Sequence, residues 1–305
     1  MKVSRTYKFL AETASIFWKG ILMGAADIIP GVSGGTIALI TGIYDRLIFA
    51  LKSINPVGLL SFLKGDYKLA RRYWTKIDYS FLIPLVLGIG FVLFAGAEFI
   101  TGLLTVYPIY MYSFFSGLIL ASGYNLYLDT ESEKSMIDWS LLLGGLALIV
   151  WLLGTPALSL PSTLPFVFLS GAVAICAMIL PGVSGAFLLL MLGQYEYMLN
   201  ALSNVTSHYP VLFIFILGAG VGLLTFVRVL SYLLRTRRRN TLALLVGLMI
   251  GALRRPIQII ISETGNIPFL SQEFIVTLSL AISSAVIGAF LVGLLHSTAE
   301  KMETG

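Results

Sequence analysis

The segment IIPGVSGG, residues 28 to 35, decides the fold because it recurs as ILPGVSGA at residues 179 to 186, an offset of 151. Proline lacks a backbone N–H and clashes with the preceding helical turn, while glycine permits irregular dihedral angles. Each copy lies in an apolar stretch, so we expect a helix to break at Pro30-Gly31 and again at Pro181-Gly182. Non-helical backbone survives at membrane depth only inside protein or beside water. The sequence therefore predicts two broken helical hairpins, whose arms either dip into the membrane and return, as re-entrant hairpins do, or span it fully.

The composition indicates a membrane protein. Of the 305 residues, 57% are hydrophobic and 11% are charged, whereas about a quarter of the residues of a soluble domain are charged. Apolar stretches approach or exceed the ~20 residues that a helix needs to cross a bilayer, and the alternation of barrel strands is absent. These features predict an all-α polytopic membrane protein in which residues 1–305 form a single membrane domain. The net charge of +5 is interpreted as a sign of membrane orientation rather than of nucleic-acid binding.

The similarity extends beyond the pentapeptide and indicates a duplicated chain. Residues 16–51 align with 167–202 without gaps, and the identities include Phe17 with Phe168 and Tyr44 with Tyr195. Downstream the offset falls to 130 because the first half carries a polar insertion around residues 64–76. We expect repeat 1 to span about 13–155 and repeat 2 about 163–298, each a hairpin followed by three helices. The expected helices are 80–104, 108–128 and 139–154 in repeat 1, and 211–234, 240–255 and 274–296 in repeat 2.

A hairpin contributes an even number of membrane crossings and three helices contribute an odd number, so the second repeat is predicted to be inverted. The charges agree with this prediction, because 17 of the 20 Lys and Arg residues fall in segments expected on one side. The connections on the other side, 105–107, 155–165 and 203–210, contain none. By the positive-inside rule both termini are predicted to be cytoplasmic. Inverted repeats with broken helices are typical of secondary transporters.

The residues that follow each break are expected to open a new helix with free N–H groups, hydroxyl donors and the positive end of the dipole, which is an anion site. These candidate phosphate-binding residues are Ser33, Gly34, Gly35, Thr36, Ser184 and Gly185. The two tips are expected to meet near the membrane midplane. The alternative is that each PGVSG is only a kink that permits close helix packing. Arg254 and Arg255, expected at the outer side, suit a lipid phosphate, although snorkelling to the interface is an equal alternative.

Three further charges lie in apolar helices. Asp27 precedes the first break and is replaced by Met178 in the second repeat. It is a candidate for coupling to protons or sodium ions, or for pairing with an arginine. Glu98 and Arg228 occupy equivalent positions, but inversion sends them to opposite sides. We therefore expect Glu98 to pair with Arg254 or Arg255, and Arg228 with Asp27 or Asp45.

Tyr44 and Tyr195 follow the hairpins at equivalent positions and are interpreted as interfacial anchors. The sequence lacks catalytic signatures. It has two histidines, a single cysteine and no HExxH, Walker A or cysteine-cluster motif. We therefore expect no catalytic residues, metal or cofactor, and ATP-driven transport is disfavoured.

The run GAADIIPGVSGGT at residues 24–36, followed by ITGIYDRL at 40–47, resembles the bacterial polyprenyl-phosphate transporter family, as does the second copy at 178–185. The resemblance implies a bacterial inner-membrane protein that returns undecaprenyl phosphate, the carrier lipid of cell-envelope polymer synthesis, from the outer to the cytoplasmic leaflet. Two alternatives stay open from the residues. One is a proton- or sodium-coupled carrier of a small anion, and the other is an intramembrane lipid-phosphate enzyme.

Overall fold

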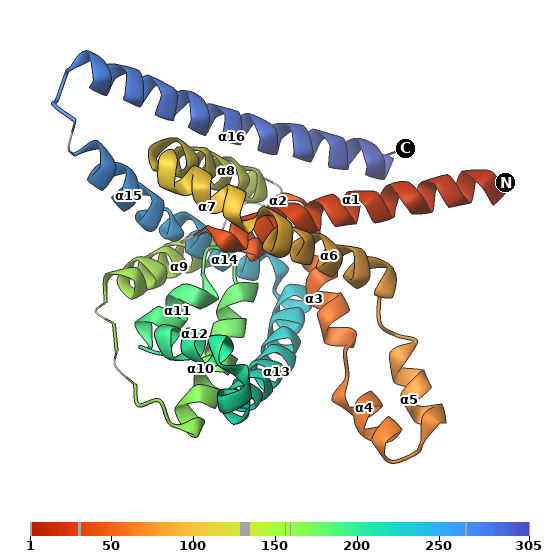
Figure 1. Ribbon diagram of the computed structural model, residues 1–305. Helices are drawn as coiled ribbons and strands as arrows, with labels where there is room; N and C mark the ends of the chain where they lie inside the picture. The colour runs from red at the N-terminus through yellow and green to blue at the C-terminus, as the bar shows by residue number, and fades with distance from the viewer. Residues whose placement is uncertain are drawn as a thin grey trace.

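The computed structural model describes residues 2–29, 32–128, 135–155, 157–158, 160–265 and 267–304, and within these ranges it contains helices and no strand (Figure 1). The helices are α1 (Lys2–Ile28), α2 (Gly34–Ile40), α3 (Tyr44–Ser53), α4 (Pro56–Leu63), α5 (Tyr67–Trp74), α6 (Tyr79–Phe91), the π-helical η1 (Val92–Gly96), α7 (Ala97–Val106), α8 (Pro108–Leu128), α9 (Met136–Gly154), α10 (Leu164–Ile179), α11 (Gly185–Met191), α12 (Tyr195–Ser203), α13 (Val205–Thr236), α14 (Arg238–Ala252), α15 (Arg254–Thr264) and α16 (Gln272–Thr304).

Six segments of the described chain are long and apolar enough to cross a membrane. They are Tyr44–Leu63, Tyr79–Val106, Met136–Gly154, Val205–Thr236, Arg238–Thr264 and Gln272–Leu294. The predicted all-helical membrane class is therefore confirmed.

Both PGVSG copies lie between a long helix and a short one. In the first half α1 ends at Ile28 and α2 begins at Gly34, while the predicted break at Pro30-Gly31 itself falls outside the described residues. In the second half α10 ends at Ile179 and α11 begins at Gly185. Gly182 there has a φ of 80°, a left-handed conformation that glycine adopts without a Cβ penalty. The second arms, α2 and α11, each have only seven residues.

The helix bounds differ from the expected ones at recognisable features. Helix α8 has the expected bounds, whereas the helix expected at 80–104 is interrupted by the π-helical η1. Helix α13 begins at Val205, ahead of the expected start at 211. Its first turn is separated from the rest by a kink with non-helical dihedral angles at His208, two residues before Pro210. The helix expected to end at 255 continues as α15 to Thr264. Because α15 begins with two arginines, its sequence does not read as an apolar span.

Glycines bring matching helix pairs into contact in the two halves. A Cβ at Gly20 of α1 would collide with the backbone of Leu85 in α6, and one at the equivalent Gly171 of α10 would collide with Phe215 in α13. Small residues permit this close approach of helix backbones in membrane proteins. The later helices cross between the halves, since α8 packs on α16 and α9 packs on α14 (Figure 1). The halves are therefore intertwined around one core.

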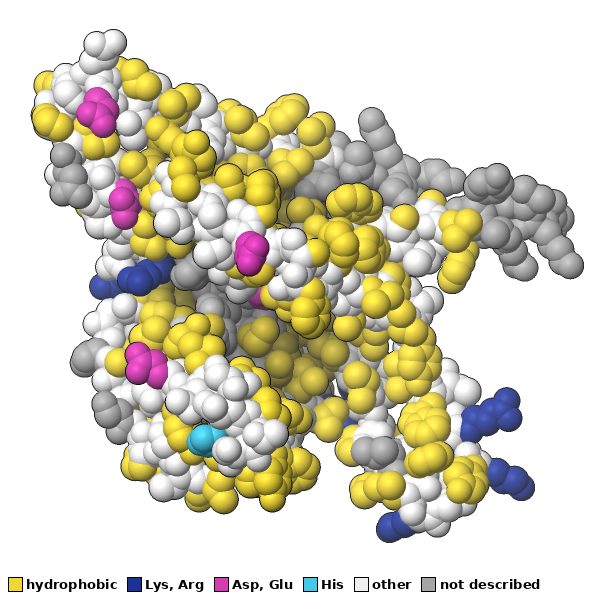
Figure 2. Space-filling model, in the orientation of Figure 1, with side chains coloured by type: hydrophobic (Ala, Val, Ile, Leu, Met, Phe, Trp, Pro, Cys, Tyr) yellow, Lys and Arg dark blue, Asp and Glu magenta, His cyan; other side chains and the backbone are white. Residues whose placement is uncertain are grey.

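The polar insertion of the first half forms the helical pair α4 and α5, which projects from the bundle (Figure 1). Lysine and arginine side chains extend from this projecting part into the surroundings (Figure 2). Asn55 and Asp66 cap the two helices by accepting hydrogen bonds from Val57 N and Leu69 N. The pair adds basic charge beside the bundle.

Candidate functional site

The two tips are joined by hydrogen bonds between residues far apart in the sequence. Ser33 Oγ donates to Leu180 O at 3.2 Å, and Tyr44 Oη donates to Ile179 O at 3.2 Å. In the opposite direction Gly182 N donates to Thr36 Oγ1 at 2.8 Å. These bonds satisfy backbone groups of the second tip that would otherwise be unpaired inside the protein. The structure thus brings together the tips that the sequence placed in separate halves.

The N–H groups of the first tip are occupied by the protein's own side chains. Gly34 N donates to Asp27 Oδ1 at 2.7 Å, and Gly35 N donates to Ser33 Oγ at 3.2 Å. A carboxylate at the positive end of a helix is electrostatically favourable. The expectation of free donors at Gly34 and Gly35 is therefore wrong, because Asp27 takes the place expected for an external anion.

The second tip has no such acid. Met178 stands at the position of Asp27, and Ser184 Oγ accepts a hydrogen bond from Phe187 N at 3.4 Å. The N–H groups of Gly185 and Ala186 have no acceptor among the residues that the structure describes. Ser33 is 1% exposed, whereas Ser184 is partly exposed. The first tip is therefore sealed and the second tip is open.

The open tip lies beside a cavity of about 290 Å³ that is bounded by helices of both halves. Its polar and charged lining consists of Asp27, Ser184, Tyr195 and Arg255. The remaining walls are backbone and apolar side chains of α1, the second tip, α9, α11 and α14, among them Ile149, Phe187 and Ala252. Figure 2 shows one face of the molecule hollowed, with basic side chains at the edge of the hollow.

The two adjacent arginines have different surroundings. Arg255 lines the cavity, whereas the guanidinium of Arg254 donates to Val150 O in α9 and fills the space beside Gly154. Arg255 is exposed, and Arg254 is partly buried. Of the two arginines predicted as outer-side charges, the structure brings only Arg255 to the wall of the cavity that Ser184 lines.

The predicted partners of the other intramembrane charges are not found. Among the described residues Glu98 makes no ion pair, and Arg228 donates to Leu224 O of its own helix. Asp45 instead pairs with Arg238 at the beginning of α14. The expected pairs of Glu98 with Arg254 or Arg255, and of Arg228 with Asp27 or Asp45, are therefore wrong.

Tyr44 and Tyr195 were not expected in the site. Tyr44 is only 2% exposed and its hydroxyl bonds the second tip, while Tyr195 lines the cavity. Their shared offset of 151 and their place one turn after each hairpin were the available signal. The interpretation as interfacial anchors is therefore wrong for Tyr44, whose hydroxyl is bonded inside the protein.

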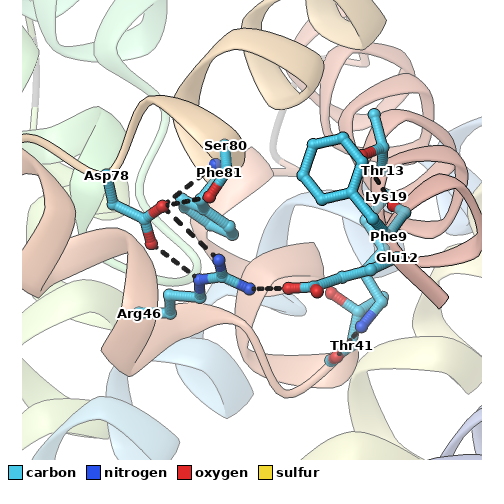
Figure 3. A network of polar contacts seen from close by, with 9 residues as sticks. All are labelled: Phe9, Glu12, Thr13, Lys19, Thr41, Arg46, Asp78, Ser80 and Phe81. Carbon is cyan, nitrogen blue, oxygen red and sulfur yellow. Dashed lines mark hydrogen bonds and ion pairs between the residues drawn. The ribbon is translucent and has the colours of Figure 1, made fainter. Parts of the chain in front are cut away.

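An ion-pair network links the helices on either side of the first hairpin, α1 and α3, to the start of α6 (Figure 3). Arg46 contacts Glu12 at 2.7 Å and Asp78 at 2.9 Å, and Ser80 Oγ donates to Asp78 at 2.7 Å. Burial opposes the charged form of Asp78, but the hydrogen bonds and positive charge of Arg46, with the bond from Ser80, hold its pKa below the ordinary value. Lys19 Nζ donates to Thr41 O at 2.9 Å and thereby caps the end of α2.

The helical fold and this site define a class of multi-pass membrane protein with a charged cavity between two broken hairpins. The chain belongs to the VCA0040-like family, described as undecaprenyl phosphate translocase-like, whose model matches residues 23–267. This is a family of transporters rather than of enzymes.

Two relatives carry the name polyprenyl-phosphate transporter. The protein from Vibrio cholerae is 44% identical over 240 residues, which cover 78% of this chain and 76% of the relative. The protein from Staphylococcus aureus is 28% identical over 250 residues, which cover 77% and 83% of the two chains. No solved structure matches the chain.

Proposed function

We propose that the protein carries undecaprenyl phosphate from the outer to the cytoplasmic leaflet of the bacterial inner membrane, returning the carrier lipid to envelope polymer synthesis and peptidoglycan recycling. The observation that carries the proposal is the cavity at the second tip, where Arg255 and Ser184 line one space. A guanidinium and a hydroxyl are suitable donors for a phosphate headgroup. The names of the two relatives support the class of substrate.

The proposed topology is an inverted repeat with both termini in the cytoplasm. The cavity is bounded by Leu153 near the end of α9 and by Tyr195 at the start of α12. Leu153 lies next to 155–165, a connection without Lys or Arg, and this connection bonds Met191 O and Leu192 O shortly before Tyr195. The cavity therefore opens toward the outer leaflet in this topology, and the hydrogen bonds of the first tip close the cytoplasmic side.

The orientation has a direct test by single-cysteine labelling in cells. In a Cys176→Ser background, an impermeant reagent applied outside should label Ser207→Cys and leave Lys68→Cys unlabelled, since both positions are exposed. Permeabilised cells, in which both cysteines should react, serve as the control. The reverse pattern in intact cells would refute the topology.

Transport coupling is assigned to Asp27 in this proposal. Its carboxylate lines the cavity and also accepts the N–H of Gly34, so a proton or sodium ion on it changes the bond that closes the first tip. Ionisable residues within membrane segments are costly and usually serve such pathways. Protons and sodium ions are the two candidates, and transport under separate pH and sodium gradients distinguishes them.

The substrate is tested with purified protein in liposomes and leaflet-resolved detection of labelled undecaprenyl phosphate. The protein should move the lipid faster than empty liposomes do, and Arg255→Gln should lower apparent affinity about ten-fold or more, the loss of one charged hydrogen bond. Arg254→Gln is the matched control because Arg254 lies outside the cavity lining. Equal lipid movement with and without protein would overturn the proposal.

The same vesicles separate the two alternatives. Uptake of inorganic phosphate in the absence of any polyprenyl lipid would favour a small-anion carrier. Release of inorganic phosphate from polyprenyl phosphate would favour a lipid-phosphate enzyme. The cavity favours the lipid carrier because apolar side chains surround its few polar groups.

A further inference from the structure

A second cavity, of about 260 Å³, adjoins the candidate phosphate site between α10, α11 and α13. Asp27, Ser184 and Ala186 line both cavities, so the two spaces meet at the open tip. Beyond these shared residues the walls of the second cavity carry no charged side chain. They are formed by small and apolar residues such as Gly171, Ala174, Met178, Leu189, Phe215 and Ala219.

The first half provides an internal comparison that shows which side chains keep this cavity open. Ala174 corresponds to Met23, and Ala219 corresponds to Ile89. Met23 is buried at 6% exposure, and Ile89 packs against the main hydrophobic core. The second half therefore has an alanine at two positions where the first half fills space with a larger side chain.

The surroundings of the second cavity are apolar on the outside of the bundle as well. Met178 lines the cavity and is 43% exposed. Leu190 and Ile216, near the cavity on α11 and α13, are also exposed. Ile216 lies on the candidate span Val205–Thr236, and exposed apolar side chains on such a span face hydrocarbon. The cavity is thus placed to receive an apolar chain from the lipid rather than a solute from water.

We propose that the second cavity binds the phosphate-proximal isoprenoid units of the lipid while Arg255 and Ser184 hold the phosphate. This inference rests on the proposed function and assigns the part of the site that recognises the chain. Of the two cavities only the first has a cationic side chain, Arg255, while the walls of the second beyond the shared residues are small and apolar. Together they match a phosphate that carries an apolar chain. Recognition of the chain would distinguish this lipid from a free phosphate.

The experiment compares phosphates that differ only in chain length. Purified protein in detergent is titrated with farnesyl phosphate, which has three isoprenoid units, and with dimethylallyl phosphate, which has one. The double variant Ala174→Met with Ala219→Ile transplants the side chains of the first half into the cavity. Val221→Ile is the matched control, since Val221 lies on α13, is exposed and is not part of the lining.

In wild type the affinity for farnesyl phosphate should exceed the affinity for dimethylallyl phosphate. This ratio should fall at least about ten-fold in the filled variant and stay unchanged in the control. Arg255→Gln should weaken both ligands alike, since it removes the phosphate contact. A filled variant that keeps the wild-type gain with chain length would overturn the inference. If Arg255→Gln leaves both affinities unchanged, the proposed phosphate site fails instead.

A second measurement does not depend on filling the cavity. Ala174→Cys in a Cys176→Ser background should react with an apolar maleimide, and farnesyl phosphate should slow that reaction. Inorganic phosphate at a saturating concentration should leave the reaction unchanged. Protection by neither ligand, or equal protection by both, would show that the chain does not occupy this cavity.

Discussion

The first and second tips share the pentapeptide PGVSG but have different surroundings. At the first tip, Asp27 accepts the N–H of Gly34, and Ser33 and Tyr44 are buried against the second tip. At the second tip, Ser184 lines two cavities. The motif therefore determines where a helix breaks, and the flanking side chains determine whether the break is sealed or open.

A few substitutions between the repeats explain this difference. Asp27 is replaced by Met178, Thr36 by Phe187 and Met23 by Ala174. The first-half residues supply an acceptor for a helix N–H, an acceptor for Gly182 N and a large buried side chain. The second repeat has no acid in place of Asp27 and a smaller side chain in place of Met23, so its tip lacks the carboxylate and the bulk that seal the first, although Thr36 still bonds Gly182 N. Ser184 is consequently available to a ligand.

The largest expected effect is on the contact between the tips. A Cβ added at Gly35 would lie 2.7 Å from the carbonyl oxygen of Ile179, a backbone atom that cannot move away alone. Gly35→Ala should therefore lower the free energy of unfolding by about 1–3 kcal/mol, the usual cost of overpacking. Thermal unfolding in detergent measures the change.

Gly102→Ala is the matched control for this substitution, because a Cβ there meets nothing within 4 Å. It should leave the melting temperature unchanged or raise it slightly, since alanine favours helix more than glycine does. Equal melting temperatures for the two variants would mean that the tips do not pack as described.

The next effect concerns the acid that only the first tip has. Asp27→Asn keeps an acceptor near Gly34 N but removes the charge, so the bond that seals the first tip should weaken by about 1–1.5 kcal/mol, the difference between a charged and a neutral hydrogen bond. If Asp27 couples transport to protons, the pH dependence of lipid movement should flatten while phosphate binding persists. Transport rates in liposomes across a pH series provide the measurement.

A different outcome would assign Asp27 another role. Loss of lipid binding with an unchanged pH profile would make Asp27 a residue that orients the substrate in the cavity. Arg255 and Tyr195 also line this cavity, so Tyr195→Phe tests whether the tyrosine contributes to any remaining pH dependence.

The two serines should separate sealing from binding. Ser184→Ala removes a hydroxyl that lines the cavity and should weaken phosphate binding by about 1.5–3 kcal/mol. Ser33→Ala removes a buried hydrogen bond to Leu180 O and the acceptor of Gly35 N, which should cost about 1–3 kcal/mol of stability with little direct effect on affinity. Binding titrations and melting curves of both variants decide between them. Equal losses of affinity would make the tips equivalent toward the ligand.

Much of the fold could be predicted from the sequence, because hydrophobic length and Pro-Gly breaks are local signals. The predicted bounds of α8, 108–128, agree with those observed, and both PGVSG copies lie between helices. Helix α15 was missed beyond residue 255 because Arg254 and Arg255 interrupt the apolar pattern that marks a membrane helix.

The site could be predicted only in part, since its bonds join distant residues. The bond from Tyr44 to Ile179 spans 135 residues, and periodicity carries no information on such a pair. Arg254 and Arg255 begin α15, and successive residues of a helix point in different directions. Arg254 therefore bonds Val150 O in α9 while Arg255 lines the cavity, a difference that the sequence does not indicate. The contact of Asp27 with Gly34 spans only seven residues, so an acid shortly before a helix N-terminus was a readable signal.

The smallest expected effect concerns an anchor that only the first hairpin has. Arg46, which bonds Glu12 and Asp78, corresponds to Tyr197 in the second repeat. Because the pKa of Asp78 is lowered in the folded protein, the network stabilises the fold above the ordinary aspartate pKa of about 4. That stabilisation is lost as the pH falls through the lowered value, when the carboxylate binds a proton.

The melting temperature of the wild type should therefore fall in acid more steeply than that of Asp78→Asn. The difference should be small because the side chains of Arg46 and Asp78 are 39% and 33% exposed, and exposed ion pairs contribute little. If the melting temperatures of the two proteins fell by the same amount from neutral to acidic pH, this network would not anchor the first hairpin.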